Sequence, residues 1–140
     1  RVGRNQIMAI KEESVTEQKN SLAVCLDNIL RHAGITRNTE YDLAQGKTAT
    51  TILSENMTGV QVLDLSGCTL DAVLYYVNQD IPVLAILEDG EAVLVTGFNE
   101  FNVVIMEPAT GKLYKKGMND ATAWFAENGN HFITYMRTEN

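Results

Sequence analysis

Two cysteines and two histidines are the side chains with the widest chemical repertoire in this sequence. Cys25 falls within an apolar pattern of helical spacing, and Cys68 follows a glycine where another helix is expected to begin. A cysteine attacks as its thiolate, and burial among apolar side chains raises the pKa of a thiol and makes it inert. The pattern therefore predicts that Cys25 packs in the core, with a role as a nucleophile as the alternative. Two cysteines make neither a metal site nor a disulfide framework, so we expect two unrelated thiols, with a pair between them as the alternative.

Neither histidine has a position that suggests a general base. His32 comes at the end of a predicted helix, where an imidazole interacts favourably with the helix dipole, and His131 opens the last predicted strand. The acidic run at 88–91 lacks the alternating ligand spacing of a calcium-binding loop. We expect structural or solvated roles for both histidines, a solvated turn for the acidic run, and no metal or cofactor.

The composition is that of an ordinary globular domain. A chain of 140 residues with 45% hydrophobic and 21% charged residues can form one domain that buries roughly two-thirds of its unfolded surface. The net charge of -7 argues against a nucleic-acid partner, because phosphate binding needs clustered Lys and Arg. No apolar run approaches the ~20 residues of a membrane span. Because the chain begins with Arg1, we expect it to be a piece of a longer protein.

The first half of the sequence is predicted to be mainly helical. Residues 1–14 are polar and weakly patterned and form a predicted lead-in segment, followed by a single domain over 15–140. From Asn20 to Gly34, apolar residues recur at spacings of three and four, which predicts an amphipathic helix capped by Asn20 or Ser21. Shorter helices are predicted around 39–46 and 48–57, and Thr69 is expected to cap another helix.

The second half is predicted to be rich in strands. Residues 60–65 alternate between apolar and polar and predict a short edge strand, and Asp89-Gly90 between two apolar runs predicts a hairpin. Further strands are expected at 102–107, 112–117 and 131–137. A last short helix at 121–128 is expected to be capped by Asn119 or Asp120. Helices followed by a mostly antiparallel sheet indicate an α+β fold.

Three segments carry a resemblance to a known family when they are taken in this order. They are ILRHAG, LDAVLYYVNQDIPVLAIL and GEAVLVTGFNEFNVVIMEPATG. The chain resembles, over residues 15–137, the papain-like cysteine peptidases that remove double-glycine leaders from bacteriocins. The resemblance implies a papain-like fold with N-terminal helices packed on a mostly antiparallel sheet. In that family the nucleophilic cysteine begins a long helix, an upstream glutamine lends an oxyanion donor, and the His and Asp come from neighbouring strands.

The resemblance places different residues at the catalytic positions of this chain. Ser21 stands at the cysteine position with Gln18 upstream, Glu91 at the histidine position and Glu107 at the aspartate position. A serine hydroxyl needs a base that can accept its proton, and a carboxylate is a weak base for an alcohol at neutral pH. Two neighbouring carboxylates also repel unless one takes up a proton, they turn apart, or a cation lies between them. The resemblance thus implies a vestigial site in which the triad has been lost.

If the chain retains the papain-like fold but has lost the triad, it is expected to be a catalytically inactive domain that binds a peptide or a partner segment of its parent protein. The first alternative is an active cysteine peptidase or amidase that uses Cys25. The second is a structural or assembly module of a larger bacterial surface or secreted protein. That Ser21 replaces a native cysteine by engineering is a further alternative.

The aromatic residues have two possible roles, in packing or in a binding groove. We expect core or half-exposed packing, with an aromatic-lined peptide groove as the alternative, for Tyr75, Tyr76, Trp124, Phe125 and Phe132. The resemblance favours an extracytoplasmic or membrane-associated bacterial context, without membrane insertion by this domain.

Overall fold

The computed structural model describes residues 6–7 and 20–138 of the chain. The predicted lead-in at 1–14 lies outside the described residues apart from 6–7, which form a short strand. In chain order the elements are β1 (Gln6–Ile7), α1 (Ser21–His32), α2 (Glu40–Ala44), α3 (Ala49–Asn56), β2 (Val60–Asp64), α4 (Leu70–Val77), β3 (Val83–Ile86), β4 (Ala92–Phe98), β5 (Asn102–Glu107), β6 (Lys112–Gly117), α5 (Met118–Glu127) and β7 (His131–Arg137).

The strands form one sheet in which every described pair is antiparallel. The strand order is β2-β7-β3-β4-β5-β6, and β1 pairs with β4 beside this path. The last strand in the chain, β7, therefore lies inside the sheet between β2 and β3, while β2 is at an edge as predicted. This arrangement of helices and antiparallel sheet confirms the predicted α+β class.

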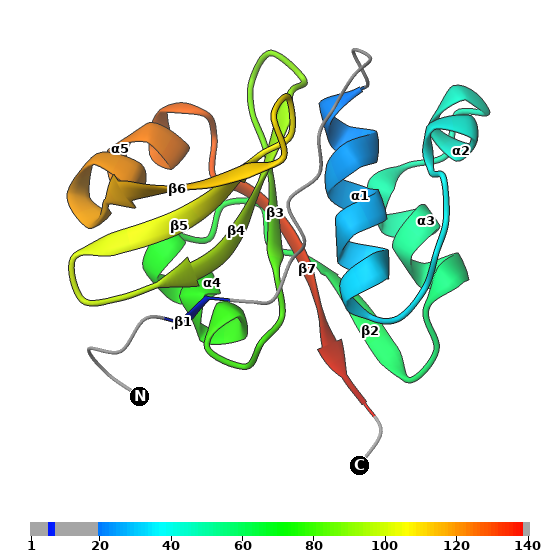
Figure 1. Ribbon diagram of the computed structural model, residues 1–140, viewed down its shortest axis with the longest axis horizontal. Coiled ribbons are helices and arrows are strands. Elements are labelled where there is room, and N and C mark those ends of the chain that lie inside the picture. The colour runs from blue at the N-terminus through cyan, green and yellow to red at the C-terminus, as the bar shows by residue number, and fades with distance from the viewer. Residues whose placement is uncertain (1–5, 8–19, 139–140) are drawn as a thin grey trace.

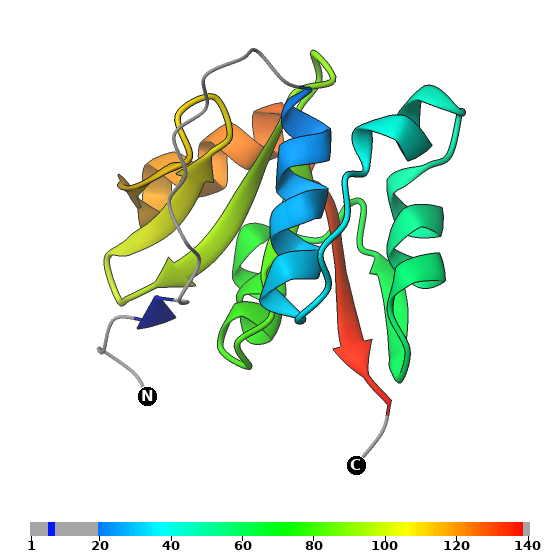
Figure 2. The ribbon, with the colours of Figure 1, turned by 45° about the vertical axis from the view of Figure 1, so that its right-hand side comes forward.

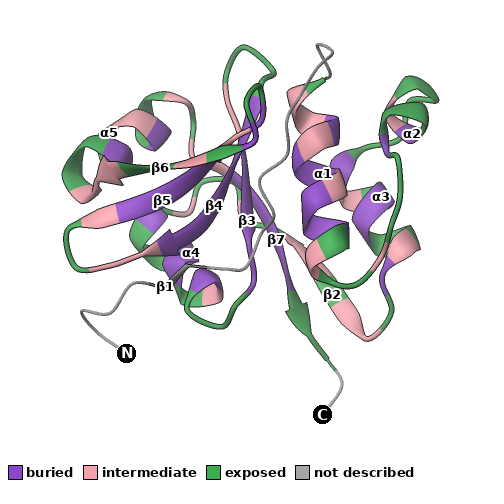
Figure 3. Ribbon diagram, in the orientation of Figure 1, coloured by how far each residue is buried: buried purple, intermediate pink, exposed green. Residues whose placement is uncertain are grey.

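Helices cover both faces of the sheet. α1 packs on β3 and β4 and α3 on β2, whereas α4 packs on β3, β4 and β7 and α5 on β5 and β6. Figures 1 and 2 show α1 and α3 on one face and α4 and α5 on the opposite face. The buried residues concentrate in the central strands and in the helix faces turned toward them (Figure 3). Among the described residues, no helix has the length and apolar character needed to cross a membrane.

The sequence signals for α1 and α4 are confirmed. Asn20 caps α1, because its side-chain oxygen accepts hydrogen bonds from the backbone N–H groups of Leu22 (2.8 Å) and Ala23 (3.3 Å). Gly34, with a φ of 87°, ends the helix in the left-handed conformation that glycine adopts without strain. Thr69 caps α4 through the N–H of Ala72. The buried face of α4 consists of Leu70, Val73, Leu74 and Val77.

The start of α5 was predicted wrongly. The helix begins at Met118, directly after β6, and its N-cap is Gly117 rather than Asn119 or Asp120. The Met118 N–H donates to the carbonyl oxygen of Phe101 at 2.7 Å, so a tertiary contact satisfies a donor at the helix start. A local cap signal cannot report such a partner, because Phe101 lies in the turn between β4 and β5.

Candidate functional site

The first residue of α1 contacts the first residue of β4. The Ser21 hydroxyl oxygen accepts a hydrogen bond from the Ala92 N–H at 2.9 Å, across a separation of 71 residues. Pairing between β4 and β5 begins only at Leu94 and Met106, so the Ala92 N–H precedes the hydrogen bonds between these two strands. The Ser21 hydroxyl provides the partner for this N–H. This bond ties the N-terminus of α1 to the start of the strand.

Glu91 lies immediately before this contact, in the hairpin turn between β3 and β4. Its N–H donates to the Asp89 carboxylate at 2.9 Å, and its carbonyl oxygen accepts from the Leu87 N–H at 2.8 Å. Gly90 has a φ of 86°, as expected for the predicted turn. The residue is exposed. The Glu91 backbone therefore lies one peptide unit from the contact between the Ala92 amide and Ser21.

Glu107 ends β5 at the same end of the sheet, because the antiparallel register places the end of β5 beside the start of β4. It is half-buried, and its carboxylate accepts a hydrogen bond from the Ala109 N–H at 3.2 Å. Its partner in the register of β6 is Lys112, which provides a cation across the strand pair. Gln18, the predicted oxyanion donor, lies outside the described residues.

Cys25 lies one turn further along α1 and is fully buried. Burial raises the pKa of the Cys25 thiol well above its ordinary value, and the carboxylates of Glu107 and Asp27 add to the rise. A buried, protonated thiol neither contacts a substrate nor attacks it, so these observations disfavour the alternative in which Cys25 is the nucleophile. Cys25 and Cys68 are both free thiols, as predicted.

We expect native-state alkylation to distinguish the two thiols. Iodoacetamide should label Cys25 more slowly than the partly exposed Cys68 by roughly a thousandfold or more, because opening a core position costs about 5 kcal/mol or more. Mass spectrometry of the Cys25→Ser and Cys68→Ser variants assigns the label. Rapid labelling of Cys25 in the folded Cys68→Ser variant would instead support the enzyme alternative.

No described histidine lies close to Ser21. α1 is 12 residues long, about 18 Å, and His32 is its last residue, with the ring Nε2 at 3.0 Å from the Asp80 carbonyl oxygen. His131 opens β7 and pairs with Ile86 of β3, which in turn pairs with Ala92 of β4. Two interstrand spacings, roughly 10 Å, separate it from the start of β4. Within the described part of the chain, no group of three or more His, Cys, Asp or Glu residues could hold a metal ion.

Comparison with known proteins identifies the fold. No family model matches the sequence, and no curated protein matches it. The structure is similar to the crystal structure of a proposed C39-like peptidase from Bacillus anthracis, with a TM-score of 0.76, 12% sequence identity, and coverage of 96% of this chain and 98% of that chain. At this identity the likeness establishes the fold and not the activity. The chain has the papain-like peptidase fold that the resemblance implied.

Two features of the structure were missed by sequence reasoning. One is the Ala92 amide as the partner of Ser21, because a hydrogen bond over 71 residues leaves no local signal. The other is a pocket at the opposite end of α1, lined in part by Tyr135 and Arg137. The alternation in β7 places these two residues on the same face of the strand, but it does not reveal the pocket, which two other segments complete.

Proposed function

We propose that this chain is a non-catalytic relative of the double-glycine leader peptidases, and that it binds an extended peptide or a segment of its parent protein beside Ser21. The observation that carries the proposal is the bond between the Ser21 hydroxyl and the Ala92 N–H. An alcohol stands at the helix N-terminus with a carboxylate as its neighbour, and an attacking alcohol needs a base that accepts its proton. The described histidines lie elsewhere, so binding without turnover is the function best supported.

The groups around Ser21 suit a particular kind of peptide. Because the hydroxyl oxygen accepts from Ala92, its hydrogen remains available to a carbonyl oxygen of a bound chain. Glu91 is exposed and Glu107 is half-exposed, so the site also presents two carboxylates. Complementary charge favours a partner of opposite sign. The ligand we propose is an extended segment that carries at least one Lys or Arg close to the carbonyl held by Ser21.

Selection from a displayed library of random dodecapeptides tests this proposal. Enriched peptides should be basic, and chromatography after prolonged incubation should recover them intact. Glu91→Lys should weaken their binding, measured by calorimetry, at least about tenfold, because it reverses the charge next to the ligand. Glu127→Lys, an exposed residue at the end of α5, is the matched control and should bind like the parent.

Two results would reject the proposal. Peptide cleavage that disappears in Ser21→Ala or Cys25→Ala would show an enzyme. Equal binding by the Glu91→Lys variant and the parent protein would place the peptide site elsewhere.

A second candidate, an assembly module, is favoured by one surface feature. Tyr75 is 62% exposed and Phe101 is 71% exposed, so neither is a core residue. Tyr75 packs edge-on against Tyr76, with ring centroids 5.1 Å apart. Tyr75 borders a pocket of about 500 Å³ that Leu74, Phe98 and Met118 also line. Exposed apolar surface outside the Ser21 site is the feature expected of an assembly module. Self-association that Phe101→Ser abolishes in sedimentation equilibrium would favour this candidate over peptide binding.

A further inference from the structure

A pocket of about 680 Å³ lies at the end of α1 that is remote from Ser21. Its volume falls within the range of about 300–1,000 Å³ typical of small-molecule sites. Three parts of the chain form it: the end of α1 with the loop that follows, the turn from α3 into β2, and the last residues of β7. Its lining residues are His32, Ala33, Ile35, Met57, Thr58, Gly59, Val60, Tyr135 and Arg137.

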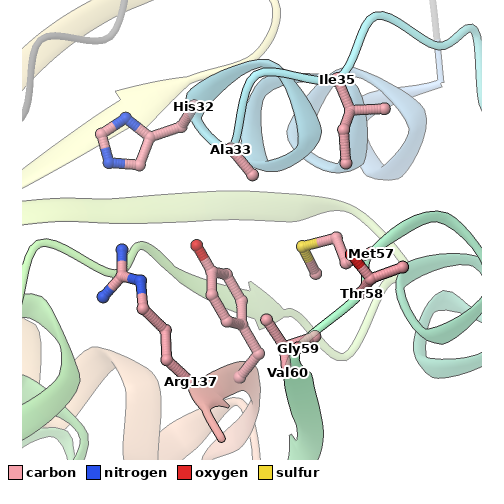
Figure 4. A pocket seen from close by; sticks show the side chains of 9 residues that line it. His32, Ala33, Ile35, Met57, Thr58, Gly59, Val60 and Arg137 are labelled. Atoms are coloured by element: carbon pink, nitrogen blue, oxygen red, sulfur yellow. The ribbon is translucent and has the colours of Figure 1, made fainter. Parts of the chain in front are cut away.

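Polar and apolar side chains occupy different ends of this pocket. Figure 4 shows His32 and Ile35 on the wall formed by α1 and its loop, and Arg137 and Met57 on the opposite wall. His32 and Arg137 lie at one end of the space, and Ile35 and Met57 lie at the other. A ligand that matches both ends must combine a polar head with an apolar body.

Tyr135 contributes a phenol hydroxyl to the lining of the pocket. The residue is only 2% exposed and lines the pocket, and no hydrogen bond to its hydroxyl occurs among the described residues. A hydroxyl that lines an open pocket without a protein partner can form hydrogen bonds with water or with a ligand. Desolvation raises the pKa of Tyr135, so the phenol stays protonated at neutral pH and can donate a hydrogen bond.

Arg137 gives the pocket a cationic group. Its Nη1 makes one long hydrogen bond, 3.4 Å, to the Gln79 carbonyl oxygen, which leaves most of the guanidinium donors available. Asp80 lies beside the same end, with its carboxylate 3.4 Å from the His32 ring. One guanidinium near one carboxylate favours a ligand with a single negative charge over a doubly charged phosphate. The planar guanidinium also matches the geometry of a carboxylate.

We propose that this pocket binds a small amphiphilic monocarboxylate. The carboxylate accepts hydrogen bonds from the Arg137 guanidinium and the Tyr135 hydroxyl, and the apolar body packs on Ile35, Met57 and Val60. Two sources share this chemistry: the C-terminal residue of a peptide with an apolar side chain, and a free short-chain carboxylic acid. The site is separate from the Ser21 region, so it stands whether or not that region binds peptides.

Titration with three probes, followed by NMR of the backbone amides, tests the proposal. N-acetyl-leucine should shift the amide signals of 32–35, 57–60 and 135–137 at millimolar concentration, whereas N-acetyl-leucinamide, which lacks the carboxylate, should not. Hexanoate separates the two sources: binding weaker than that of N-acetyl-leucine indicates a peptide terminus, and equal or tighter binding indicates a free acid. Both of these results support a carboxylate site.

Variants identify the groups responsible. Arg137→Gln should weaken N-acetyl-leucine binding at least about tenfold, and Tyr135→Phe, which keeps the ring, should weaken it several-fold. Lys115→Gln, an exposed residue on β6, removes the same charge away from the pocket and should leave binding unchanged. Equal binding of the acid and the amide, or unchanged binding by Arg137→Gln, would overturn the proposal.

Discussion

Replacing Ser21 by cysteine and Glu91 by histidine in the same molecule should produce a thiol that iodoacetamide labels about tenfold faster at pH 6 than the thiol of Ser21→Cys alone. The expectation follows from the contact between Ser21 and the Ala92 amide, which places the backbone of position 91 one peptide unit from the side chain of position 21. An imidazolium beside a thiol stabilises the thiolate, and the N-terminus of α1 acts in the same direction.

The size of this effect comes from two opposing terms. A fall of the thiol pKa from about 8.5 to about 6.5 raises the thiolate fraction at pH 6 by nearly a hundredfold. The less basic thiolate is a weaker nucleophile, which removes roughly a factor of ten. The pH profile of labelling is therefore the clearer measurement, and its midpoint should move toward lower pH in the double variant.

The control for this experiment is a histidine elsewhere in the same hairpin. Glu88 is exposed, and its N–H bonds to the Asn128 side chain rather than to α1. Ser21→Cys with Glu88→His should label like Ser21→Cys alone, with Cys25 and Cys68 replaced by serine in every variant. Identical pH profiles for the two double variants would mean that positions 21 and 91 do not cooperate, and the vestigial-site assignment would fail.

The local structure could be predicted from the sequence because its causes are local. Asn20 and Thr69 cap their helices through their own first turns, and Asp89-Gly90 supplies the conformation that the hairpin requires. The strand order could not be predicted in the same way. Nothing in residues 131–137 indicates that this strand lies between β2 and β3, because that position depends on pairing with residues far away in sequence.

The contacts of the candidate site could not be predicted from the sequence, and its assignment as a vestigial site stays a prediction. The resemblance selects Ser21, Glu91 and Glu107, and the structure places them near the start of β4 and the adjacent end of β5. The burial of Cys25 could be predicted from the spacing of apolar residues in the helix. The pocket beside Tyr135 could not be predicted from any sequence pattern. A pocket forms where three distant segments leave space between them, and each segment alone has an ordinary amphipathic pattern.

The internal position of β7 also predicts the largest effect on stability. Phe132 is fully buried, pairs with Ala85 of β3 in the sheet register, and packs edge-to-face against Phe125 of α5, with ring centroids 5.3 Å apart. Phe132→Ala removes this packing and leaves a cavity between the sheet and α5, which costs about 3–5 kcal/mol. A domain of ordinary size has only about 5–15 kcal/mol in total.

Urea denaturation measures this effect against a control in the same strand. With a slope of about 2 kcal/mol per molar urea, Phe132→Ala should lower the midpoint by roughly 2 M. Met136→Ala, at a position that is 40% exposed and pairs with Gln61 of β2, should cost less than about 1 kcal/mol. Because Cys25 becomes accessible only when the core opens, its labelling should accelerate in Phe132→Ala and not in Met136→Ala. Similar midpoints for the two variants would mean that the buried Phe132 ring contributes no more to stability than the half-exposed Met136 side chain.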